Sequence, residues 1–425
     1  TLKGVQRLRH LQGALSIAPE LPEAHERLAA HYRQEHQGAV QRGDNQAAVA
    51  ALALLRAHDA GQHADYLAGR AWLELEVTPP EAEVRVARLV EVDRRLAPVE
   101  PQPVRARATR VEVEHGSLLV SAQAVGHHSA VFPVHLGRTD AWSGRLELLP
   151  AGELAMDHIH VPAGWFASGG DSLAPNALPG RRVWVDGFVI ERFPVTNARF
   201  IAFLNDLVRR GEVESAESVQ PRSGPSPVYH RDDDGCFVLG PDEHGDEWSP
   251  DWPVLLVDWH GARAFARWQA EQTGQAWRLP HELEWEKAAR GVDGRTYPWG
   301  DFFYEAWCAT AAAPGRRPLP QVVDSFPGDE SVYGVRGLAG NSRDWCCNAW
   351  TGDLVGADGR IIWTHPTDAD NRTIRGGGWA AAPRYSRVCF RYGAPAQFRN
   401  PMVGVRLVRS LDGADPSCVC DDTAG

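Results

Sequence analysis

Large aromatic side chains are concentrated between residues 155 and 411, which hold most of the 16 Trp of this chain. With 41 Gly and 30 Pro, the chain also has many turns. A region with little regular structure needs large rings to bury enough apolar area for stability. We therefore expect the Trp side chains of residues 155–411 to pack in the core of a domain.

The length and the charge of the chain exclude several classes of protein. A chain of 425 residues exceeds what one hydrophobic core usually organises, so we expect two or three domains. The net charge of −11 opposes phosphate backbones, and no run of about 18 apolar residues occurs, so we expect no nucleic acid partner and no membrane insertion. Seven Cys without a repeated spacing favour reduced thiols and a cytoplasmic location.

Residues 1–70 have a composition typical of helices, because Ala, Leu, Arg and Glu dominate and Pro and Gly only separate the segments. The order of apolar residues around Pro19 and Pro22 predicts a helix–turn–helix pair. This segment resembles a tetratricopeptide repeat. Since only one clear unit is present, we expect a remnant or a spacer rather than a stable array.

Apolar and polar residues alternate at 73–77, 83–86, 111–114 and 131–136, which predicts half-buried strands. We expect residues 71–150 to form a small β-sandwich-like module. The stretch from Thr78 to Val84 resembles the PEGA-type β domain of bacterial envelope and signalling proteins.

Several short motifs follow one another in a fixed order within residues 155–411. They are Val195-Thr196-Asn197, Val257-Asp258-Trp259-His260, Arg278-Leu279-Pro280-His281-Glu282, Gly340-Asn341 with Asp344-Trp345, and Arg375-Gly376-Gly377-Gly378-Trp379. Together they resemble the formylglycine-generating-enzyme (sulfatase-modifying-factor) family. The resemblance implies an α+β fold, a variant of the C-type lectin fold with little regular structure. Independently, Pro280 and His281 predict the start of a helix over 282–290.

The enzyme of this family is an oxidase that binds copper through two Cys after the Gly-rich turn. The matching positions are Ala381 and Ser386, which cannot bind as thiolates. The family's other enzymatic branch uses a three-His iron site with a His-x-x-x-His pair, which the spacing of His25, His31 and His36 does not supply. We therefore expect no copper and no enzymatic activity; the alternative is a metal-dependent oxidase of the formylglycine-generating or non-haem-iron sulfoxide-synthase type.

The resemblance also implies a structural calcium site, because the loop Gly340 to Trp345 matches the family's Gly-Asn-x-x-Glu-Trp pattern with Asp344 in place of Glu. The predicted ligands are Asn341 and Asp344, since an amide oxygen and a carboxylate suit calcium.

The segment 379–402 is rich in aromatic and Arg side chains, which commonly anchor interfaces. Without catalytic residues, a lectin-like scaffold still presents loops for binding. We expect a non-catalytic module that binds an unknown protein or small-molecule ligand, while Arg387 and Arg391 pair with buried carboxylates. The predicted ligand-binding residues are Trp379, Ala381, Arg384, Tyr385, Phe390, Tyr392, Phe398 and Asn400.

Two further resemblances suggest where such a module occurs. The 379–402 segment resembles the diversified segment of variable proteins from diversity-generating retroelements. The order of the three parts resembles the C-terminal half of bacterial Ser/Thr kinases that carry a sensor-like domain. No kinase motif occurs, so we expect any kinase domain to precede Thr1 in a longer chain. Residues 412–425 are expected to form a flexible tail.

Overall fold

The computed structural model describes residues 2–41, 43–242, 245–314, 317–364, 366–367 and 369–411. The chain forms two compact units, one of residues 1–75, 108–116 and 136–144, the other of residues 76–107, 117–135 and 145–425. The three-part division predicted from the sequence stays a prediction, and the predicted tail lies outside the described residues. None of the helices in the described ranges is long and apolar enough to span a membrane.

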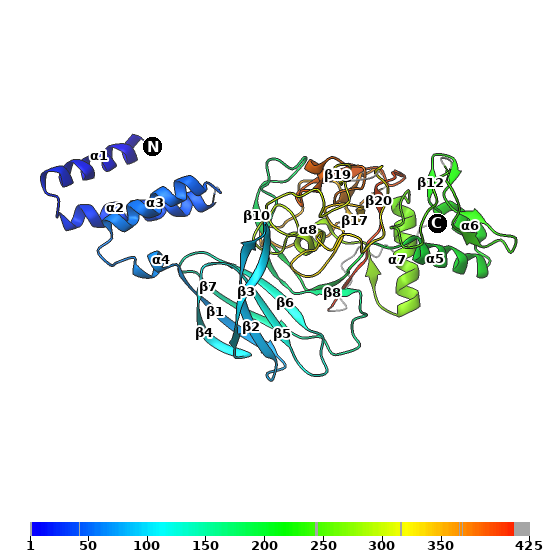
Figure 1. The fold of residues 1–425 in the computed structure, drawn as a ribbon, viewed down its shortest axis with the longest axis horizontal. Helices are drawn as coiled ribbons and strands as arrows, with labels where there is room; N and C mark the ends of the chain where they lie inside the picture. The colour runs from blue at the N-terminus through cyan, green and yellow to red at the C-terminus, as the bar shows by residue number, and fades with distance from the viewer. Residues whose placement is uncertain are drawn as a thin grey trace. The chain divides into compact units, whose positions relative to one another are not determined.

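Helices occupy the first part of the chain, in agreement with its composition (Figure 1). Their mutual contacts are made by Leu28, Tyr32, Leu55 and Tyr66, which are buried in one apolar cluster. The Asp44 side chain accepts a hydrogen bond from the Ala47 N–H and so begins the third helix. The likeness to a tetratricopeptide repeat stays a prediction. The helices are α1 (Leu2–Ile17), α2 (Pro22–Gln41), α3 (Asn45–His58) and α4 (Ala64–Ala68).

The four predicted strands are present as β1, β2, β4 and β6; together with three strands that were not predicted, they form two sheets with the orders β4-β1-β7 and β3-β2-β5-β6, and the β-sandwich-like module stays a prediction. Buried residues alternate along β1, as the sequence predicts for a half-buried strand. A PEGA-like identity of these strands stays a prediction. The strands are β1 (Arg70–Thr78), β2 (Glu83–Val92), β3 (Arg95–Val104), β4 (Arg107–Glu114), β5 (Gly116–Gln123), β6 (Ala130–Leu136) and β7 (Ala141–Glu147).

The rest of the chain has mixed helix and sheet with long connecting loops, as expected. One four-stranded sheet has the order β16-β21-β11-β8, and a second has the order β19-β18-β17-β20, in which only the β17–β20 pair is parallel. The strands of these sheets are β8 (His158–Val161), β11 (Phe188–Glu191), β16 (Trp277–Arg278), β17 (Arg343–Ala349), β18 (Arg372–Arg375), β19 (Arg391–Ala394), β20 (Val403–Gly404) and β21 (Val408–Ser410).

Shorter elements complete this region, and aromatic rings fill its core as the sequence predicts. Phe200 of α5 and Phe265 of α7 stack with ring centroids 5.5 Å apart, and Trp285 and Trp345 are fully buried. The remaining elements are β9 (Gly164–Ser168), β10 (Arg181–Val185), α5 (Asn197–Arg209), α6 (Val213–Val219), β12 (Arg222–Ser223), β13 (Ser226–Pro227), β14 (His230–Arg231), β15 (Phe237–Val238), α7 (Trp259–Thr273), α8 (Glu282–Arg290) and the 3-10 helix η1 (Pro383–Ser386).

Helix α8 begins and ends where the sequence predicts, but every one of its residues is buried. His281 and Glu284 form a capping box that fixes its start. Its five charged side chains need partners, because an isolated buried charge is costly. Glu282 and Glu286 pair with Arg375, which comes from β18. Helix α8 is therefore held to the second sheet by ion pairs as well as by apolar contacts.

Candidate functional site

A Gly-rich turn joins β18 to the segment 379–402. Gly376 has a φ of 96°, a conformation that favours glycine. A Cβ atom on Gly377 would lie 1.9 Å from the carbonyl oxygen of Ala339, so only glycine allows this close approach. The turn places Trp379 against the loop before β17, where the Trp379 N–H donates to the Asn341 carbonyl at 3.0 Å.

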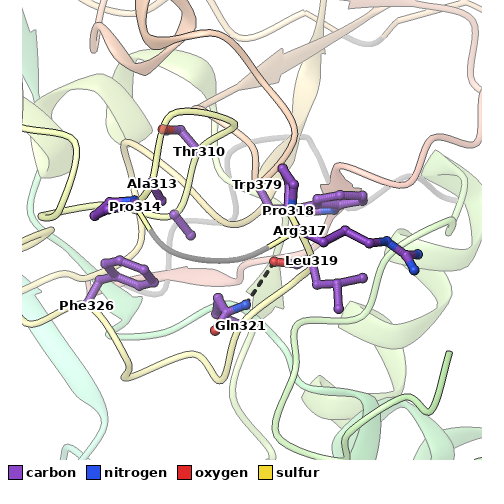
Figure 2. Close-up of a pocket in the computed structure, with 10 residues that line it drawn as sticks. Thr310, Ala313, Pro314, Arg317, Pro318, Leu319, Gln321, Phe326 and Trp379 are labelled. Carbon is purple, nitrogen blue, oxygen red and sulfur yellow. Dashed lines mark hydrogen bonds between the residues drawn. The ribbon is translucent and has the colours of Figure 1, made fainter.

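A cavity of about 260 Å³ lies beside Trp379 (Figure 2). Its wall combines apolar and polar side chains, and the Trp379 indole is held in place because its Nε1–H donates to the Pro401 carbonyl at 2.6 Å. The Thr310 hydroxyl oxygen accepts from the Ala312 N–H at 3.3 Å, which leaves its own O–H available as a donor. The lining residues are Ala309, Thr310, Ala313, Pro314, Arg317, Pro318, Leu319, Gln321, Phe326 and Trp379.

Of the residues that line this cavity, only Trp379 was predicted from the sequence. The others lie in the loop 309–326, between recognisable motifs, where small residues and Pro follow no periodic pattern. The loop reaches the predicted surface through a backbone hydrogen bond from Ala311 N–H to the Ala381 carbonyl at 3.1 Å. No pattern in the sequence indicates this contact, because the two residues that it joins are about seventy positions apart in the chain.

The predicted ligand-binding residues around η1 differ widely in exposure. Ala381 and Phe390 are buried, Tyr385 is half-buried and Arg384 is exposed. A guanidinium N–H of Arg384 donates to the Tyr385 hydroxyl oxygen at 2.7 Å. The Tyr385 and Phe390 rings pack edge to face, with centroids 5.0 Å apart. Tyr385 and Phe390 therefore form one aromatic pair at the base of this segment.

The remaining predicted residues lie further along the same segment. Tyr392 and Phe398 are half-buried, with ring centroids 6.0 Å apart. Asn400 has a local structural role, because its Oδ1 accepts from the Met402 N–H at 2.9 Å and its carbonyl accepts from the Leu256 N–H. Neither its amide nor the Phe398 ring lines the cavity beside Trp379.

The two arginines expected to have structural roles do pair with carboxylates. Arg387 donates to both oxygens of Asp171, at 2.6 and 2.9 Å. Arg391 donates to both oxygens of Glu282, at 2.5 and 2.7 Å. Bidentate pairs of this kind fix the backbone of the 379–402 segment at two points.

The cavity and the 379–402 segment both lie in a part of the chain that matches a known family. Residues 148–411 match the sulfatase-modifying factor enzyme 1-like domain, and this match covers more than half of the 425 residues. The chain belongs to this family. Its mixed helix-and-sheet region from residue 148 onward is thus the family's domain, in agreement with the resemblance found in the sequence.

Two relatives of this family member are named enzymes. A hercynine oxygenase from Mycolicibacterium smegmatis is 33% identical over 285 residues, which are 61% of this chain and 63% of the relative. A formylglycine-generating enzyme from Thermomonospora curvata is 28% identical over 288 residues, which are 58% of this chain and 89% of the relative. The matches to two hercynine oxygenases span 63% and 54% of their lengths.

Among solved structures, Treponema denticola variable protein 1 aligns with a TM-score of 0.44 and 19% identity, over 60% of this chain and 95% of that chain. A variable protein thus occurs among the structural neighbours of this family member. The likeness is too low to support a functional inference, and diversification of the 379–402 segment stays a prediction.

The expectation that this family member is not an enzyme is wrong. Its relatives include two hercynine oxygenases and a formylglycine-generating enzyme, which points to an oxidase-type enzyme family. The expectation rested on the side chains at Ala381 and Ser386. The residues at these two positions show that the copper ligands of the family are missing. They do not show that the rest of the domain has no catalytic activity.

The residues at the family's copper positions do not fit a copper ion. The Ala381 methyl group has no donor atom, and Ser386 offers a hydroxyl group in place of a thiolate. Burial, together with the nearby Asp329, raises the pKa of Cys308. Burial and the neighbouring Glu286 raise the pKa of Cys389 to about 12, so this thiol is protonated at neutral pH. Copper(I) binds thiolates, and the surroundings of Cys308 and Cys389 favour the protonated thiol instead.

The predicted calcium ligands already have partners within the protein. Asn341 Oδ1 accepts from the Gln321 N–H at 3.0 Å. Asp344 Oδ2 accepts from Trp285 Nε1–H at 2.8 Å and from Arg406 Nε–H at 2.9 Å. In the described ranges, no three His, Cys, Asp or Glu side chains form a group that could hold a metal. Calcium at this loop stays a prediction.

Proposed function

We propose that this chain is an oxidase-type enzyme that binds a compact, partly aromatic substrate in the cavity beside Trp379. The observation that carries the proposal is the cavity itself, which combines apolar side chains, the indole ring of Trp379 and the Thr310 hydroxyl, whose O–H can donate. Substrate pockets typically have about 300–1,000 Å³, so a cavity of about 260 Å³ favours a small molecule.

Each part of the cavity has a specific role in this proposal. Trp379 supplies a flat ring for stacking, and its hydrogen bond to Pro401 fixes the orientation of that ring. Thr310 donates to a polar atom of the substrate. Leu319 and Phe326 supply apolar contacts for the rest of the substrate. The proposal assigns substrate binding to these residues and no step to the thiolate copper site, which this chain does not fit.

Hercynine, the compound in the name of the Mycolicibacterium smegmatis relative, is the first substrate to test. The test measures heat of binding and oxygen consumption with the whole chain and hercynine. We expect Trp379→Ala to weaken binding at least tenfold, since stacking on an aromatic ring contributes about 0.5–1.5 kcal/mol beyond the apolar area. We expect Trp379→Phe to retain most of the binding.

Trp165→Ala provides the matched control, because Trp165 is a partly exposed ring outside the cavity. It should bind hercynine as the wild-type chain does. Absence of any hercynine-dependent heat and oxygen uptake would contradict this choice of substrate. Substrate-dependent oxygen uptake that is unchanged in Trp379→Ala would contradict the placement of the active site.

A further inference from the structure

The buried side chain of Arg343 differs from the other buried arginines of this domain. Arg343 begins β17, where its N–H donates to the Met402 carbonyl at 2.7 Å, and its exposure is only 7%. Its guanidinium lies over three rings of the 379–402 segment, 5.7 Å from the centroid of Tyr385, 5.2 Å from Phe390 and 6.0 Å from Tyr392. These rings form an aromatic cage around one end of the cation.

In the described ranges, no ion pair joins the Arg343 guanidinium to a carboxylate, and its Nε–H is buried without a hydrogen-bond partner. By contrast, Arg375 and Arg406 each reach a carboxylate as well as backbone carbonyls. Removing a charge from water is unfavourable, and contacts with aromatic faces offset only part of this cost. Burial accordingly lowers the pKa of Arg343. The cage alone does not offset the cost of this charge.

We propose that Arg343, Tyr385 and Tyr392 form a binding site for the carboxylate group of a small aromatic acid. The fork of N–H groups on a guanidinium matches the two oxygens of a carboxylate. Aromatic walls suit the attached ring, because rings pack edge to face against one another. The site is separate from the cavity beside Trp379, whose lining does not include these three residues, and it does not depend on the proposed function.

The hydrogen bonding of Tyr385 favours an anionic ligand over a neutral one. Arg384 donates to the Tyr385 oxygen, so the Tyr385 O–H proton remains available to donate to a ligand. Arg384 itself adds a second positive charge at the exposed side of the cage. With 7% of its surface exposed, Arg343 offers little area to a ligand, which favours contact with a small group such as a carboxylate.

The test compares benzoate with benzamide, which has nearly the same shape without the charge, by titration calorimetry on the whole chain. We expect benzoate to bind at least tenfold more tightly than benzamide. Arg343→Met should abolish this preference, and Arg343→Lys should retain part of it, because an ammonium keeps the charge but loses the fork. Arg360→Met is the control. It removes an exposed Arg that pairs with Asp186, and this variant should bind benzoate and benzamide as the wild-type chain does.

A second measurement separates binding from a purely structural role of Arg343. Benzoate should raise the Tm of the wild-type chain and of Arg360→Met, but not that of Arg343→Met. If Arg343→Met does not fold, Tyr385→Phe takes its place and should weaken benzoate binding without changing benzamide binding. Equal binding of benzoate and benzamide to the wild-type chain overturns the proposal. Displacement of benzoate by inorganic sulfate at equal concentration overturns the assignment to an aromatic acid.

Discussion

At the scale of single residues, Glu282 shows how the family's domain keeps charges in its core. Its two oxygens accept from Arg375, Arg391, Asn348 and Thr373, so all the lone pairs of the carboxylate have donors. These donors come from three strands that lie far from α8 in the sequence. The buried acid is stable because its partners surround it, not because burial favours the charge.

Replacing Glu282 by Gln should strongly destabilise the domain. The change keeps the size of the side chain but leaves Arg375 with one acid and Arg391 with none, and breaking a buried pair costs about 3–5 kcal/mol. Unfolding in urea, followed by Trp fluorescence, measures this loss. Glu271→Gln is the control, because that exposed partner of Arg210 should contribute less than about 1 kcal/mol. Equal unfolding midpoints for the two variants would contradict this account.

At the scale of elements, the sequence predicted those features that depend on neighbouring residues. The start of α8 follows from Pro280 and His281, and the alternation at 73–77 identifies β1. The burial of α8 on all sides was not predictable, because charged residues usually face water and the partners of Glu282 lie on strands distant in sequence. The cavity loop 309–326 was missed for a related reason, since its role depends on contacts with Trp379 rather than on its own pattern.

The turn at Gly377 gives a prediction at the same scale. Gly377→Ala places a methyl group 1.9 Å from the Ala339 carbonyl oxygen, so the backbone of the turn or of the 338–342 loop must shift. We expect a loss of at least about 2 kcal/mol in the free energy of unfolding. Gly352→Ala, whose nearest neighbour lies 4.0 Å from the added methyl, should change stability by less than about 0.5 kcal/mol. Wild-type stability of Gly377→Ala would show that this turn is not tightly packed.

At the scale of the whole molecule, buried histidines make stability depend on pH. Burial, and then the nearby Lys287, lowers the pKa of His160 to about 4, and burial lowers that of His281 to about 4 as well. Between pH 4 and about 6.5, the unfolded chain binds protons at these positions and the folded chain does not. Stability is therefore highest above about pH 6.5 and falls as the pH decreases toward 4.

His160→Gln tests this dependence, because glutamine cannot titrate. We expect the variant to lose less stability than the wild-type chain between pH 7 and pH 5, as measured by urea unfolding at each pH. His230→Gln removes an exposed histidine and should leave the wild-type profile unchanged. A profile of His160→Gln that superimposes on the wild-type curve would show that burial of this imidazole does not contribute to the acid response.

The ionic frame around α8 also has an evolutionary consequence. Since Arg375 serves Glu282 and Glu286 together, a mutation at one of these positions can survive only with a compensating change elsewhere. Ala381 carries no such obligation, because its side chain takes part in no ion pair or hydrogen bond. A change at Ala381 therefore breaks no ion pair, whereas the arginines and glutamates around α8 have to change together.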